Sequence, residues 1–257
     1  MPRASAHLWT PHQGQAVSEE DAAICPTSDA AIELRAPAIA IDPNYGQALG
    51  VLAATHAFSA HMGWVDTATT LPIAERAALA AIRADNEDPW AHLALGYVNL
   101  FRRRFDDSLA EFELALQLDP NFSQAQGYYG LTLSYCGRWE EGDVAARRAL
   151  RLSPRDPFSA MYCGIAAYAQ FLGRNYDEAM RLAGDGIRQR GDFVGAHRVL
   201  TAAAGMAGQS DVAKAALQEL RRAQPNISLA WIKSQMPIKQ DADREHYLEG
   251  FRRAGLE

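Results

Sequence analysis

The amino-acid sequence predicts an all-helical fold of repeated helix pairs, and three observations lead to this prediction. Among the apolar residues, which make up 48% of the 257-residue chain, Ala and Leu far outnumber Val and Ile. That balance favours helix over strand. Glycine, proline and aromatic markers recur at a fixed interval, as in repeat architectures. Aspartate–proline pairs stand where helices would begin.

The interval between markers is 34 residues, and each marker has a physical role in a helix–turn–helix unit. Four pairs keep the interval: Gly96 and Gly130, Phe105 and Trp139, Ala115 and Ala149, and Pro120 and Pro154. A glycine inside a helix costs about 1 kcal/mol relative to alanine, which is tolerable where a paired helix approaches closely. The prolines end the second helix of a pair, and Asp88-Pro89 predicts the start of a first helix.

Small residues at the helix contact, an aromatic residue opening the second helix and a terminal proline together resemble the tetratricopeptide repeat (TPR) family. This resemblance implies a solenoid of antiparallel helix pairs, wound as a right-handed superhelix and closed by a C-terminal capping helix. It also implies that the first helix of each pair lines a groove in which partner peptides lie.

The same markers divide the chain. We expect a flexible segment at 1–27, an unpartnered helix within 28–43, and repeat units at about 44–86, 87–120, 121–154, 155–191 and 192–225. A linker and the capping helix fill 226–257. The first unit is stretched, with helices at Tyr45–His61 and Leu71–Ala84, and unit 155–191 departs from the 34-residue interval by two or three residues.

The closing segment carries a narrower resemblance. Trp231, Met236-Pro237-Ile238 and Tyr247 to Leu256 resemble the end of the TPR region that follows the catalytic domain in bacterial class III adenylate/guanylate cyclases. This resemblance implies a regulatory tail of a signalling protein. The sequence offers no pair of metal-binding aspartates in a strand–turn–strand setting, so the cyclase catalytic domain itself is not expected.

Motifs that carry other chemistry are missing from the sequence. The seven histidines form no His-Glu-x-x-His motif, and the three cysteines form no Cys-x-x-Cys pair. No phosphate-binding or dinucleotide-binding glycine motif is present. We therefore expect no catalysis, no metal and no cofactor, and free thiols in a reducing compartment.

Charge and hydropathy narrow the partners and the location. A net charge of −6 disfavours nucleic acid, which needs a concentrated basic surface. No stretch approaches the roughly 20 apolar residues of a membrane span, and residues 1–15 lack the apolar run of a secretory signal. The expected location is the cytoplasm.

The expected site is the groove of the first helices. Projecting the two regular units, and extending the stripe, predicts an apolar and aromatic lining of Trp90, Leu93, Tyr97, Phe101, Phe122, Leu131, Tyr135 and Phe171. This lining lacks the Lys/Asn/Arg set with which chaperone-binding TPRs clamp a carboxylate. The groove suits an apolar helix or strand of a partner protein, or the chain's own C-terminal segment with Trp231 and Phe251. Equally, several of these side chains could be core between repeats.

The leading interpretation is a TPR module for protein–protein interaction. Two alternatives stay open. One is an enzyme, in which the chain is part of a class III adenylate cyclase. The other is a self-associating structural module, in which the unpartnered helix within 28–43 pairs with a second copy.

Overall fold

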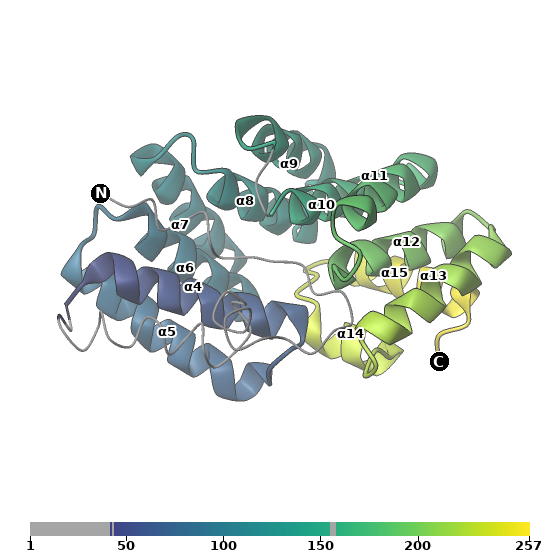
Figure 1. Ribbon diagram of the computed structural model, residues 1–257, viewed down its shortest axis with the longest axis horizontal. Coiled ribbons are helices and arrows are strands. Elements are labelled where there is room, and N and C mark those ends of the chain that lie inside the picture. Colours follow the sequence, from purple (N-terminus) through teal and green to yellow (C-terminus); the bar gives the residue numbers. More distant parts are fainter. Residues whose placement is uncertain (1–41, 43, 155–157) are drawn as a thin grey trace. The chain divides into compact units, whose positions relative to one another are not determined.

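A computed structural model describes residues 42, 44–154 and 158–257, and every regular element in these ranges is an α-helix. The all-α prediction is confirmed (Figure 1). The expected flexible segment 1–27 and nearly all of the expected helix within 28–43 lie outside the described residues. The chain divides into two compact units, up to Pro120 and from Asn121 onward, and each is described by itself.

Unit 1 contains two helix pairs. The first pair is α4 (Gly46–Met62) with α5 (Thr67–Ala84), and the second is α6 (Pro89–Phe101) with α7 (Phe105–Leu118). Helix α4 packs against both α5 and α6, and α6 packs against α7. Each first helix of this unit therefore contacts its partner and the other first helix, as expected of stacked repeats.

Helix α5 begins four residues earlier than its predicted start at Leu71. The side chain of Asp66 accepts a hydrogen bond from the backbone N–H of Thr69 at 2.9 Å and so caps the helix. Pro72 falls inside the helix as a result. The long connection expected in the stretched first unit is therefore mostly helix.

Helix α6 starts as the sequence predicts. Asp88 is its N-cap, Pro89 occupies the first turn, and the Asp88 carboxylate accepts a hydrogen bond from Trp90 N–H at 3.0 Å. Inside the pair, a methyl group on Gly96 would lie 2.7 Å from the ring of Phe112, which is fully buried. The glycine marker thus makes room for an aromatic side chain of the second helix.

Unit 2 contains three helix pairs and a C-terminal addition. The pairs are α8 (Ser123–Tyr135) with α9 (Trp139–Leu152), α10 (Ser159–Leu172) with α11 (Tyr176–Gln189), and α12 (Val194–Met206) with α13 (Ser210–Ala223). The expected linker contains a short helix, α14 (Leu229–Gln235), and the expected cap is α15 (Asp241–Ala254). Helix α15 packs on α12 and α13 (Figure 1).

Candidate partner-binding surface

The eight residues predicted to line a groove all belong to first helices or their caps, and they divide between the two units. In unit 1, Leu93 and Tyr97 are fully buried on α6, whereas Trp90 and Phe101 are half-buried. Tyr97 makes an edge contact with Phe112 at 5.9 Å between ring centroids. Phe101 stacks on His61 of α4 at 5.0 Å. These side chains are therefore engaged within the unit, and partner binding by them stays a prediction.

In unit 2, Leu131, Tyr135 and Phe171 are buried. Phe122, which precedes the first residue of α8, is half-buried. Tyr135 and Phe171 lie beside residues of the chain's own C-terminal segment. We call one side of the first helices in unit 2 the aromatic face, and define it by Tyr135 on α8, Tyr168 and Phe171 on α10, and Arg198, Ala202 and Gly205 on α12.

A run of ring contacts joins the aromatic face to α15. Tyr168 contacts both Tyr135, at 5.2 Å, and Tyr247, at 5.3 Å. Phe171 contacts Tyr247 at 5.2 Å and His246 at 4.8 Å. Such edge and tilted ring pairs stabilise by about 0.5–1.5 kcal/mol beyond the area they bury. The C-terminal helix is thus held on α10 by aromatic packing.

Burial on this face changes the chemistry of the phenols. Tyr168 and Tyr247 are almost fully buried, and burial raises the pKa of both hydroxyls, since it penalises the charged phenolate. Both hydroxyls are therefore neutral where the face meets α15, and these tyrosines act as aromatic surface rather than as acids.

The segment ahead of α15 also lies on this face. The backbone N–H of Lys239 donates to the carbonyl oxygen of Tyr135 at 2.9 Å, where α8 ends. The Tyr135 hydroxyl donates to the sulfur of Met236 at 3.9 Å. Met236, Pro237 and Ile238 are buried. An extended stretch of the chain is therefore fixed across the end of α8 by one backbone hydrogen bond and apolar contact.

Arg198 supplies the one cation of the aromatic face. Its guanidinium lies 4.5 Å from the ring centroid of Trp231, and its Nε donates to the side-chain oxygen of Gln224 at 2.8 Å. Arg198 is 1% exposed, and burial lowers its pKa to about 10. The guanidinium remains charged at neutral pH, and the Trp231 ring stabilises it as a cation–π partner.

Two glycines set the contact between α12 and α15. A methyl group on Gly205 would come within 2.0 Å of the carbonyl oxygen of Gly250, and one on Gly250 within 2.5 Å of the carbonyl oxygen of Ala202. The two backbones therefore approach more closely than any side chain at either position would allow. The occupant helix is selected by shape as well as by its aromatic residues.

Sequence reasoning missed four residues of the aromatic face: Tyr168, Arg198, Ala202 and Gly205. Tyr168 was missed because α9 and α11 begin 37 residues apart, at Trp139 and Tyr176, so the 34-residue interval misplaces residues on α10. Aligning the turns before the second helices, rather than the glycines, would have corrected this. Arg198 gave no sign, because a lone arginine in a helix usually faces solvent.

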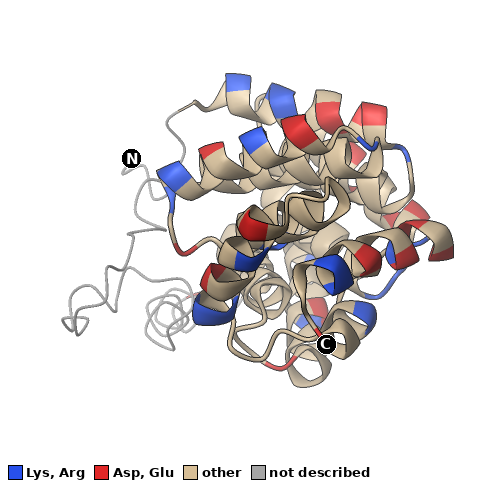
Figure 2. Cartoon of the chain, turned by 90° about the vertical axis from the view of Figure 1, so that its right-hand side faces the viewer, with Lys and Arg blue, Asp and Glu red and all other residues tan. Residues whose placement is uncertain are grey.

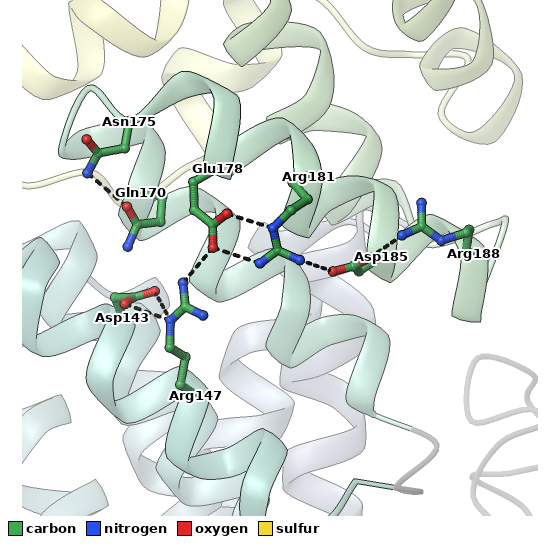
Figure 3. Close-up of polar contacts among 8 residues, drawn as sticks. All are labelled: Asp143, Arg147, Gln170, Asn175, Glu178, Arg181, Asp185 and Arg188. Carbon is green, nitrogen blue, oxygen red and sulfur yellow. Dashed lines mark hydrogen bonds and ion pairs between the residues drawn. The ribbon is translucent and has the colours of Figure 1, made fainter.

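The outward side of unit 2 is different, because its charges pair with each other. Lys/Arg and Asp/Glu are interspersed along the same helices rather than separated by sign (Figure 2). Across α9 and α11, Asp143, Arg147, Glu178, Arg181, Asp185 and Arg188 form a continuous ladder of ion pairs (Figure 3). Hydrogen bonds from Arg181 and then Arg147 lower the pKa of Glu178 to about 2. Because the ladder is solvated, each pair contributes at most about 1 kcal/mol.

Metal-ligating side chains do not gather within the described ranges. No group of three or more His, Cys, Asp or Glu side chains there could hold a metal ion. Cys136 and Cys163 are in the thiol form, and burial raises the pKa of the Cys163 thiol. None of the helices in the described part is long and apolar enough to cross a membrane.

Comparison with known proteins places the fold. No protein-family model and no curated protein matches the chain. The type IV pilus biogenesis factor PilW aligns with a TM-score of 0.57 at 16% identity, over 77% of this chain and 90% of its own. TTC0263, a TPR protein of Thermus thermophilus, aligns with a TM-score of 0.51 at 17% identity, over 63% of this chain and 82% of its own.

The Cut9–Hcn1 hetero-tetramer of the APC/C contains a chain that aligns with a TM-score of 0.65 at 15% identity. That alignment covers 82% of this chain and 40% of the other. Identities this low concern the fold and leave function open. The chain is an all-α solenoid with the helix-pair fold of TPR-type proteins.

Proposed function

We propose that the chain is a protein-binding scaffold without catalysis of its own, and that the first helices carry its partner-binding face. One observation supports this most directly: the aromatic face already holds a helix and an extended segment, both from the chain itself. Ring contacts, a cation–π contact and one backbone hydrogen bond hold them. Helix-in-groove recognition uses the same interactions.

Crosslinking in native lysate, followed by mass spectrometry, tests the proposal. Phe101 of unit 1 and Phe122 of unit 2 are half-buried members of the predicted lining, so replacing both by Ala removes contact area from the first helices of each unit. The matched control replaces Leu114 and Val144, which are 38% and 64% exposed on second helices. We expect partner recovery to fall at least about tenfold for F101A/F122A, since one lost aromatic anchor costs about 1 kcal/mol or more.

The control L114A/V144A should recover partners as the wild type does. Circular dichroism and thermal unfolding must first show that both double variants remain helical. Equal recovery by all three proteins would remove the first helices as the partner-binding face.

The same proposal extends to a cytoplasmic regulatory segment of a signalling protein. What supports it is the resemblance of the closing segment, Trp231 and Tyr247 to Leu256, to cyclase TPR regions. The crosslinking experiment also tests this extension. We expect a signalling protein among the recovered partners. If no signalling protein is recovered, the chain remains a proposed scaffold without a regulatory role in signalling.

A further inference from the structure

We infer that the C-terminal segment, residues 229–256, is a releasable occupant of the aromatic face, and that the partner is an amphipathic helix of the same chemistry that competes with it. This inference rests on the proposed function for the identity of the face. The juxtaposition that carries it is the seat of α15: Tyr247 and Phe251 are 1% and 0% exposed, and both lie on the side that meets α10 and α12.

Helix α15 would keep its own ion pairs if it left the aromatic face as an intact helix. Its ion pairs join residues of α15 to one another: Asp241 with Arg244, Glu245 and Glu249 with Arg252, and Glu249 with Arg253. Acidic residues lie in its first turn and arginines in its last turn, which suits the helix dipole. Release would therefore keep the ion pairs of α15, but it would break the hydrogen bond between the Tyr176 hydroxyl on α11 and His246 Nε2, 3.2 Å apart, and lose apolar burial.

The connection to α13 is held mainly by apolar contact. Within α14 only Ile232 is buried, and Trp231 remains half-exposed over Arg198. The extended stretch that follows buries Met236, Pro237 and Ile238 and gives one backbone hydrogen bond to α8, from Lys239 to Tyr135. Such a linker can let α15 depart while α8 to α13 keep their own pairs.

The surface on which α15 lies also determines which helix can bind there. It takes two aromatic side chains four residues apart, as Tyr247 and Phe251 are, so both lie on one helical stripe. It takes a residue without a side chain directly before the second aromatic, because Gly250 meets the backbone of Ala202. A competing partner helix carries the pattern aromatic-x-x-Gly-aromatic, with an apolar, uncharged side toward α12.

Occupancy from within the chain lowers the apparent affinity for a partner. If only a fraction of molecules has α15 released, the apparent dissociation constant rises by the inverse of that fraction. Weakening the seat from the occupant's side should therefore strengthen binding of a helix in trans, while the face itself stays unaltered.

The test uses the full chain and a fluorescein-labelled synthetic peptide of residues 236–257, with binding followed by fluorescence anisotropy. Gly250→Leu separates α15 from α12, and Phe251→Ala removes a buried ring from the occupant. Ala242→Leu changes an exposed residue of the same helix and is the matched control. We expect at least about tenfold tighter peptide binding by G250L and F251A than by wild type and A242L.

Equal peptide affinity of all four proteins, or no binding by G250L and F251A, would overturn the inference. Hydrogen exchange of the wild type gives an answer that does not depend on any variant folding. Amides of α15 should exchange faster than those of α12, and a single common rate would contradict release. A wild-type dimer in light scattering that F251A abolishes would make the occupant a second copy's α15 and overturn the intramolecular contact.

The outcome separates this inference from the proposed function. Peptide competition with no partner recovered by crosslinking would leave a self-binding helix and remove the scaffold role. Partner recovery without peptide competition would leave the scaffold and remove α15 as the competitor.

Discussion

At the scale of the residue, two histidines on first helices stabilise the turns that precede those helices. His92 and His197 each place Nε2 near a carbonyl oxygen six residues upstream, of Asn86 at 2.9 Å and of Gly191 at 2.7 Å. They are 105 residues apart, as are the starts of α6 and α12. The same histidine position therefore stabilises, in two repeats, the turn that connects one helix pair to the next.

Only His92 has an acidic partner. Its Nδ1 lies 2.7 Å from a carboxylate oxygen of Glu111 on α7, whereas Ala216 occupies the corresponding place on α13. Both ring nitrogens of His92 face oxygen acceptors, an arrangement that favours the doubly protonated imidazolium. Burial opposes that charge, but the hydrogen bonds to Glu111 and Asn86, with the charges of Glu111 and Asp88, raise the pKa of His92 overall.

We therefore predict a pH-dependent contribution of His92 to stability. Because its folded pKa is raised above the usual 6.5, the contribution is fully present below pH 6.5 and is lost as pH rises through the folded value. Urea unfolding of wild type and His92→Gln should differ most near about pH 5.5–6 and less near about pH 9. Glu111→Gln should flatten the dependence. A difference that grows with rising pH would show that the ring is neutral in the fold.

At the scale of the element, a glycine inside a helix either allows a close contact with another helix or only lowers helix propensity, and the atoms around it show which applies. Gly130 and Gly184 both lie inside helices, α8 and α11. A methyl group on Gly130 would come within 2.8 Å of the backbone oxygen of Gly142, and one on Gly184 would meet only the guanidinium of Arg188 at 3.4 Å. A methyl group at position 130 would therefore meet rigid backbone, whereas one at position 184 would meet only a flexible side chain.

The two substitutions to Ala should thus have opposite signs. Gly130→Ala forces α8 and α9 apart and should lower the free energy of unfolding by about 1–3 kcal/mol. Gly184→Ala gains helix propensity and should raise it by about 0.5–1 kcal/mol. Chemical denaturation of the two variants beside wild type measures both. If Gly130→Ala is neutral or stabilising, the close approach of α8 and α9 is wrong.

The helix starts show which elements could be predicted from the sequence and which could not. Helix α6 and the helices that follow at Phe105 and Trp139 could be predicted, because local rules set them: an aspartate cap, a proline in the first turn and an aromatic opening. The start of α5 was missed because Thr67, Thr69 and Thr70 are weak helix formers, although the aspartate cap at Asp66 is a local signal for it. The short α14 gives too little periodicity to detect.

The candidate site was predictable in kind, and the chain's own C-terminal segment was one of the occupants that the sequence left open. Periodicity placed Tyr135 and Phe171 on the first-helix side, and both do contact the chain's C-terminal segment there. That the helix on Phe171 is the chain's own α15 depends on the long-range fit of Gly205 with Gly250, which no local pattern encodes. Burial of Leu93 and Tyr97 likewise follows from packing that only the folded chain reveals.

At the scale of the whole molecule, contacts are mostly between neighbouring helices in the sequence. Within unit 2, α8 packs on α9 and α10, α10 on α11 and α12, and α12 on α13 and α15. Such arrays owe their stability to repeats and to the contacts between adjacent repeats, so they tolerate division at a repeat boundary better than division inside one. Mostly local contacts also favour fast folding.

We predict that residues 121–257 fold without the rest of the chain. This fragment begins at a boundary between units, keeps the three complete pairs α8 to α13, and retains α15 over α12. Far-UV circular dichroism should show a helical fragment with a cooperative thermal transition. The matched control, residues 138–257, starts inside the first of these pairs and leaves α9 without α8, exposing Ala145, Ala146 and Ala149. It should melt at a lower temperature or without cooperativity. A fragment 121–257 that lacks a cooperative transition, or melts like the control, would mean that unit 2 has no independent core.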